Sequence, residues 1–167
     1  MTTAVCPGSF DPITLGHLDV VRRARSMFDE VVVGVASNSS KSALLGVEDR
    51  VRLARAAVAD LPGVRVEPVV GLLADFVRAQ GAVAVVKGLR GGADFDAELP
   101  MALMNRHLSG VETVFVVGDP ALAHIASSLV KDVARFGGAV EGLVPPAVAH
   151  AVREALGVRP APGGSTG

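Results

Sequence analysis

Short runs of β-branched and other apolar residues recur along the chain and predict five strands. The runs cover residues 4–6, 31–36, 64–66, 82–86 and 113–117. Between them, apolar residues follow a helical spacing near residues 18–28, 47–61 and 72–77. Strands that alternate with helices are typical of βαβ units, and near-continuous Val and Ala runs suit parallel strands that are buried on both faces. The pattern predicts one α/β domain with a mostly parallel five-stranded sheet.

Three further helices are predicted in the second half of the chain. One covers about residues 93–108 and contains Pro100, so it is either kinked there or begins nearer that proline. A second is capped by Ser127 or Ser128 and stopped by the glycines at 137–138. The last opens at the prolines 145–146 and reaches Leu156. A domain over residues 1–157 and a flexible tail over 158–167 are therefore expected.

Composition excludes several classes of protein. Sixteen Lys and Arg against seventeen Asp and Glu give a net charge of −1, and Trp and Tyr are absent, so a general nucleic-acid binder is not expected. No apolar run approaches the roughly 20 residues that span a bilayer, so no membrane partner is expected either. The single cysteine, Cys6, and an N-terminus without a signal-peptide pattern favour a cytoplasmic protein.

Cationic and hydroxyl side chains follow several of the predicted strands. In an open parallel sheet, ligands bind beyond the carboxyl ends of the strands. Residues expected at this edge are Ser9, Phe10, Thr14, Gly16, His17, Lys41, Lys87, Gly88, Leu89, Arg90, Ser127 and Ser128. Their convergence in a chain without net positive charge predicts a bound polyanion, held by cations and by the backbone N–H groups of glycine-containing loops.

The segment 14–17 is the most informative part of this set. If Thr14 caps the first helix, His17 lies in its first turn, beside unpaired N–H groups that favour phosphate. The helix end would lower the pKa of His17 and a phosphate would raise it. Gly16 leaves room for a nucleotide against the backbone. Taken alone, a histidine at the start of a helix is more often only a capping or surface group, and for His17 by itself that interpretation would be favoured.

Other common signatures are missing from the sequence. No P-loop and no G-x-G-x-x-G motif occurs, which argues against a P-loop NTPase and a dinucleotide-dependent oxidoreductase. The histidines are scattered without zinc spacing, so no protein metal ligands are predicted. Cys6 is expected to be a small core residue.

Several motifs in order resemble one known family. The segment 7–12 (PGSFDP) followed by 14–17 (TLGH) resembles the start of nucleotidyltransferases with a T/H-x-G-H motif. Together with Lys41 and the segments 86–90 (VKGLR), 104–107 (MNRH) and 127–131 (SSLVK), the chain from about residue 3 to 156 resembles the bacterial phosphopantetheine adenylyltransferases.

This resemblance implies a fold, a reaction and an assembly. The fold would be a Rossmann-like, doubly wound parallel sheet with C-terminal helices. The reaction would join the adenylyl group of ATP to 4'-phosphopantetheine, giving dephospho-coenzyme A and pyrophosphate in coenzyme A synthesis. Mg²⁺ as cofactor, a cytoplasmic location and a homohexamer built as a dimer of trimers are implied as well.

The resemblance also implies roles for individual residues. The catalytic set would be His17, Lys41 and Arg90. The ATP site would contain Ser9, Phe10, His17, Gly88, Leu89, Arg90, Glu98, Ser127 and Ser128. The acceptor would contact Ser9, Lys41, Leu73 and Lys87.

The chain departs from the family pattern at several positions. Lys87 stands where arginine is common, the segment 121–126 lacks the usual aromatic residue and one serine, and Ala97 and Pro100 replace larger or polar residues. These departures leave two alternatives: an enzyme for another phosphorylated acceptor, or a catalytically weak regulator that binds coenzyme A or ATP. The intact catalytic set favours chemistry, whereas the altered segment 122–126 favours the regulator.

Overall fold

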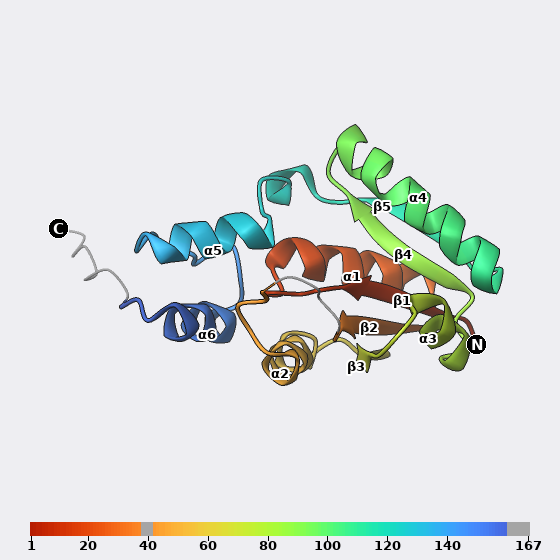
Figure 1. Cartoon of the computed structure of the whole chain (residues 1–167), viewed down its shortest axis with the longest axis horizontal. Coiled ribbons are helices and arrows are strands. Elements are labelled where there is room, and N and C mark those ends of the chain that lie inside the picture. The colour runs from red at the N-terminus through yellow and green to blue at the C-terminus, as the bar shows by residue number, and fades with distance from the viewer. Residues whose placement is uncertain (38–41, 160–167) are drawn as a thin grey trace.

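The computed structural model describes residues 1–37 and 42–159, and its strands form one parallel five-stranded sheet (Figure 1). The strands are β1 (Thr3–Gly8), β2 (Glu30–Ala36), β3 (Val64–Val69), β4 (Ala84–Leu89) and β5 (Glu112–Val117). Their order in the sheet is β3-β2-β1-β4-β5, with every neighbouring pair parallel. The five predicted strands and the α/β doubly wound fold are confirmed. The order of the strands reverses between β1 and β4.

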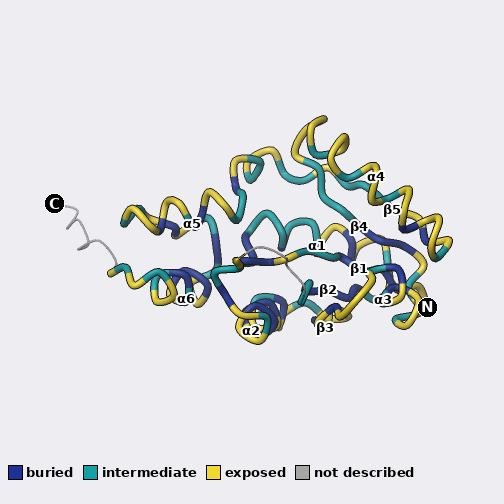
Figure 2. Tube along the Cα trace, in the orientation of Figure 1, coloured by how far each residue is buried: buried dark blue, intermediate teal, exposed yellow. Residues whose placement is uncertain are grey.

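Helices cover both faces of this sheet, because alternate strand residues point in opposite directions. The helices are α1 (Leu15–Met27), α2 (Val47–Ala57), α3 (Leu73–Ala79), α4 (Gly92–Ser109), the 3₁₀ turn η1 (Pro120–Leu122), α5 (Ser127–Arg135) and α6 (Pro146–Leu156). On one face, Ala4 and Cys6 of β1 pack in the larger core cluster with α1 and α2. On the other face, Val5 packs with Val77 of α3. Figure 2 shows the central strands as largely buried.

Helix α4 begins at Gly92 and runs through Pro100 to Ser109. The alternative start nearer Pro100 is therefore wrong. Proline removes a backbone donor and crowds the carbonyl four residues earlier, here that of Asp96. Both Asp96 and Pro100 are exposed, so water can hydrogen-bond to that carbonyl.

The C-terminal helices α5 and α6 pack against each other beside the sheet. Helix α6 begins at Pro146, as predicted, but the residue before α5 is Ala126, which makes no side-chain cap. The predicted cap by Ser127 or Ser128 is therefore wrong. Ser127 instead donates its hydroxyl to the carbonyl of Pro12 at 2.8 Å, which ties α5 to the loop after β1.

Two further observations bear on the sequence predictions. Over residues 1–37 and 42–159, no helix is long and apolar enough to cross a bilayer. Cys6 is 3% exposed, as expected for a core residue, and burial raises the pKa of its thiol to about 12. Most of the tail expected at 158–167 lies outside the described residues.

Candidate active site

A cavity of about 340 Å³ opens at the carboxyl ends of β1 and β4, where the strand order reverses. This is the place where doubly wound sheets bind their ligands. Residues predicted for the site that line this cavity are Ser9, Phe10, His17, Lys87, Gly88, Leu89, Arg90, Glu98 and Ser127. The predicted convergence of cations, imidazole and hydroxyl groups is confirmed for these residues.

Two predicted residues lie elsewhere, and a third is not described. Leu73 lines a second, adjoining cavity of about 260 Å³, which shares Ser9, Lys87 and Glu98 with the first. Ser128 is exposed and lines neither cavity. Lys41 lies outside the described residues, so its position relative to the cavities stays a prediction.

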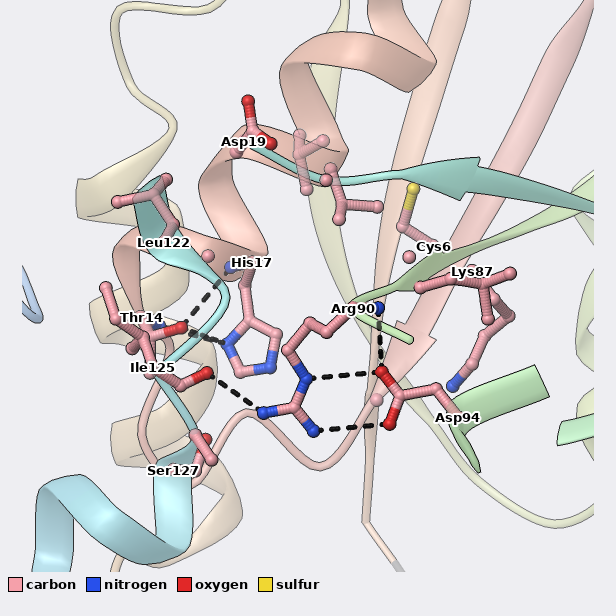
Figure 3. Close-up of a pocket in the computed structure, with 18 of the residues that line it drawn as sticks. Cys6, Thr14, His17, Asp19, Lys87, Arg90, Asp94, Leu122, Ile125 and Ser127 are labelled. Carbon is pink, nitrogen blue, oxygen red and sulfur yellow. Dashed lines mark hydrogen bonds and ion pairs between the residues drawn. The ribbon is translucent and has the colours of Figure 1, made fainter. Parts of the chain in front are cut away.

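His17 is held by the first turn of α1, which Thr14 caps as predicted. The backbone N–H of Thr14 donates to His17 Nδ1 at 3.0 Å, and the N–H of His17 donates to Thr14 Oγ1 at 3.3 Å (Figure 3). Because Nδ1 accepts a hydrogen bond, the neutral ring carries its proton on Nε2. The Phe10 ring packs against this imidazole edge to face, with the ring centroids 5.0 Å apart.

The electrostatic environment keeps the His17 imidazole neutral. Burial, followed by the positive charges of Lys87 and Arg90, lowers its pKa to about 4. Spacing in the sequence left the direction of this shift open; in the free protein its causes are burial and two cations of the cavity. His17 therefore offers a hydrogen-bond donor, Nε2–H, to an anion without having to gain a proton.

Arg90 is fixed by two partners that hold its guanidinium over the cavity (Figure 3). Asp94 Oδ2 accepts from the backbone N–H of Arg90 at 2.8 Å and from its Nε at 3.2 Å, and Arg90 Nη1 donates to the carbonyl of Ile125 at 3.2 Å. The hydrogen bond from the Arg90 backbone is the main reason why the pKa of Asp94 is lowered. Asp94 was not among the predicted site residues, although it lies four residues after Arg90.

Lys87 lies at the junction of the two cavities. Its Nζ is 3.3 Å from Glu98 Oε1, and the two side chains are 25% and 34% exposed. A cation at this junction can contact an anion in either cavity.

Asp11 organises the loop behind the cavity. Its carboxylate accepts from the backbone N–H groups of Leu44 and Leu45, both at 2.9 Å, and from Lys131 Nζ at 3.0 Å. Burial alone would raise the pKa of Asp11, but these hydrogen bonds outweigh it and lower the pKa. Asp11 thus connects the loop after β1 to the segment before α2 and to α5.

The segment that departs from the family pattern borders the first cavity. Leu122, Ala123, Ile125 and Ala126 line it, whereas His124 is exposed and does not. Gly16 also lines the cavity, and a Cβ there would lie 4.0 Å from the carbonyl oxygens of Leu122 and Ile125. This end of the cavity is therefore aliphatic, without an aromatic ring.

The described part of the chain contains no group of side chains that could form a protein-bound metal centre. There, no three His, Cys, Asp or Glu side chains lie together in an arrangement that could hold a metal ion.

Comparison with known proteins adds independent findings. The cytidylyltransferase-like family model matches residues 5–133. The phosphopantetheine adenylyltransferase of a Nocardioides strain is 57% identical over 148 residues, covering 89% of this chain and 93% of the relative. That of Kocuria rhizophila is 55% identical over 155 residues, covering 92% of this chain and 99% of the relative.

A solved structure supports the fold. A Vibrio parahaemolyticus protein, provisionally assigned as a nicotinate-nucleotide adenylyltransferase, superposes with a TM-score of 0.68 at 19% identity and covers 93% of this chain and 95% of that chain. At this identity the likeness concerns the fold alone. Family model and curated relatives together show that the chain belongs to the cytidylyltransferase-like family and, within it, to the phosphopantetheine adenylyltransferases.

Proposed function

We propose that this protein transfers AMP from ATP to 4'-phosphopantetheine, giving dephospho-coenzyme A and pyrophosphate. Its curated relatives carry the corresponding name. The observation that carries the proposal is the pair of adjoining cavities, which share Ser9 and Lys87 and have His17 and Arg90 in the first. Such a site can hold two substrates with their phosphates side by side.

The reaction needs alignment and charge compensation rather than a general base, since the acceptor phosphate is already a nucleophile. Its oxygen attacks the α-phosphorus of ATP, and the bond to the pyrophosphate oxygen breaks. Negative charge that develops on the α-phosphate oxygens is stabilised best by hydrogen-bond donors that are already in position before the reaction. His17 Nε2–H is such a donor, because Thr14 fixes the opposite ring nitrogen.

We assign the ATP to the first cavity and the pantetheine arm to the second. The aliphatic end near Leu122 and Ala123 would receive the adenine, and Arg90 would face the phosphates. The phosphate of the acceptor would bind the ammonium group of Lys87, which lines both cavities. Leu73 would contact the pantetheine arm. Further phosphate contacts by Ser127, Ser128 and Lys41 remain part of the proposal.

Mg²⁺ is expected to arrive bound to the ATP phosphates. This ion usually keeps several waters and binds through substrate phosphates together with one or two carboxylates. Asp19 and Asp119 both line the first cavity and could contribute such a carboxylate. The ion would supply charge neutralisation of the triphosphate.

The reaction is tested by mixing the purified protein with ATP, Mg²⁺ and 4'-phosphopantetheine and measuring pyrophosphate and dephospho-coenzyme A. Equal amounts of both products are expected, and EDTA should abolish turnover. Other phosphorylated acceptors serve as controls for acceptor choice. Tight coenzyme A binding without any product would instead favour a regulator.

We further propose a cytoplasmic homohexamer. Helix α4 buries only Asn105, and Figure 2 shows much of α4 and α5 as exposed in the single chain. The exposed large apolar residues there are Phe95, Leu99, Met101, Leu103, Met104, Leu108, Leu129, Val133 and, directly after α5, Phe136. Two separate apolar faces suit a dimer of trimers, which needs two kinds of interface. Light scattering should give about six times the 17.0 kDa chain mass, and a monomer would contradict the proposal.

A further inference from the structure

Arg50 of α2 is buried directly behind the active site, with 2% of its surface exposed. Its Nη1 donates to the carbonyls of Ser9 at 2.7 Å and Ala36 at 2.8 Å, and its Nε donates to the carbonyl of Leu45 at 3.0 Å. These acceptors belong to the loop after β1, the end of β2 and the segment before α2. One guanidinium therefore joins three segments of the chain at the edge of the sheet that carries the cavity.

The partners of Arg50 are unusual for a buried cation. Among residues 1–37 and 42–159, no carboxylate forms an ion pair with Arg50, and its hydrogen-bond acceptors are three backbone carbonyls. Burying a charge without a counterion is costly, and the rigid fork of arginine fits several acceptors at fixed angles. The geometry thus requires arginine specifically, where lysine could reach fewer of the three carbonyls.

The hydrogen bond to Ser9 acts on a strained backbone position. The Ser9 carbonyl belongs to the peptide unit that precedes Phe10, and Phe10 has a φ of 49°. A non-glycine residue in this region needs support from its surroundings. Fixing the Ser9 peptide unit fixes the direction of the Phe10 side chain, whose ring packs on the His17 imidazole.

We propose that Arg50 is a positioning residue for the adenylyl transfer described above, acting on His17 through the Ser9 carbonyl and the Phe10 ring. The expected effect on kcat rests on the proposed function. The chain of contacts from Arg50 to His17, in contrast, exists in the free protein. Since Phe10 is 5% exposed and also contacts the Gly8 position, it cannot turn without moving its neighbours. Loss of the Arg50 hydrogen bonds should therefore displace the imidazole.

The test compares Arg50→Gln and Arg50→Lys with the unchanged protein. Arg50→Gln should lower kcat about ten-fold or more and change the KM for ATP less than about three-fold, because a small misplacement costs mainly transition-state alignment. Arg50→Lys should lower kcat less than Arg50→Gln does. In NMR spectra of the free protein, the His17 ring resonance, identified by its absence in His17→Asn, should shift in both variants, and its pKa should rise from about 4.

Two variants of the same helix serve as controls. Arg55 also donates to a strand carbonyl, that of Val66 in β3, but its side chain is 58% exposed. This hydrogen bond does not involve Ser9. Arg55→Gln should leave kcat and the His17 resonance unchanged. Leu53 is 3% exposed in the core, so Leu53→Ala should lower stability about as much as an Arg50 variant without moving His17.

Several results would overturn the proposal. A folded Arg50→Gln with kcat within two-fold of the unchanged protein, or with an unmoved His17 resonance, would do so. So would Leu53→Ala shifting kcat and the resonance equally, since that would mean a general loss of stability. If Arg50→Gln does not fold, Arg50→Lys decides by the same criteria. If the unchanged protein shows no turnover, the proposed function fails and the resonance alone still decides on Arg50.

Discussion

Replacing His17 by asparagine is expected to lower kcat for dephospho-coenzyme A formation about 10²- to 10³-fold, while the Kd of ATP changes only a few-fold. Removing a fixed donor that faces developing negative charge typically has this effect on kcat. The asparagine oxygen can still accept the Thr14 N–H hydrogen bond, so the start of α1 should remain intact. Steady-state kinetics together with ATP titration of the free protein measure both quantities.

Glutamine at the same position provides the matched comparison. Its longer side chain can bring an amide N–H near the place of Nε2, so His17→Gln should keep more activity than His17→Asn. Equal losses of kcat and of ATP affinity would make His17 a binding residue only. Full activity of His17→Asn would remove the imidazole from the reaction.

The positions of the strands and of the His17 cap could be predicted because they depend on local signals. Val31–Val33 is an apolar run of strand length, and the structure places it in β2. The capping pair depends only on the three-residue spacing between Thr14 and His17. The edge of the sheet that binds ligands then followed from the rule for parallel sheets, which brought Arg90 and Ser127 to the same cavity.

What could not be predicted depends on contacts between distant segments. Arg50 lies on the same helical face as Val47, Val51 and Ala54, and this position was the available signal that it is buried. Its acceptors are backbone carbonyls, which every residue has, so no side-chain pattern marks them. Ser127 likewise looks like a helix cap, but the carbonyl of Pro12, 115 residues away, takes its hydroxyl.

The positive charges of the cavity link substrate binding to the protonation state of His17. In the free protein, Lys87 and Arg90 add to burial in disfavouring the imidazolium. Each also has a carboxylate partner, Glu98 and Asp94 respectively, which limits the charge that is free to attract an anion. Bound phosphates would counter both cations, so the pKa of His17 should be higher in the ATP complex than in the free protein.

Acidification from about pH 7 to about pH 5 is expected to destabilise the free protein by about 2 kcal/mol through His17 alone. The pKa is about 4 in the folded protein and about 6.5 when unfolded, so the unfolded chain binds a proton that the folded protein does not. The stabilisation is present above about pH 6.5 and is lost as the pH falls toward 4. Urea unfolding at a fixed protein concentration measures it, in a buffer without phosphate.

His17→Asn isolates this effect, because it removes the titrating group and keeps the capping acceptor. The variant should lose about 2 kcal/mol less than the unchanged protein over the same pH interval. Identical pH dependence of the unchanged protein and His17→Asn would show that the free cavity accepts an imidazolium. His17 could then enter the reaction as an imidazolium cation. In that case the positive charges of Lys87 and Arg90 do not keep the imidazole neutral.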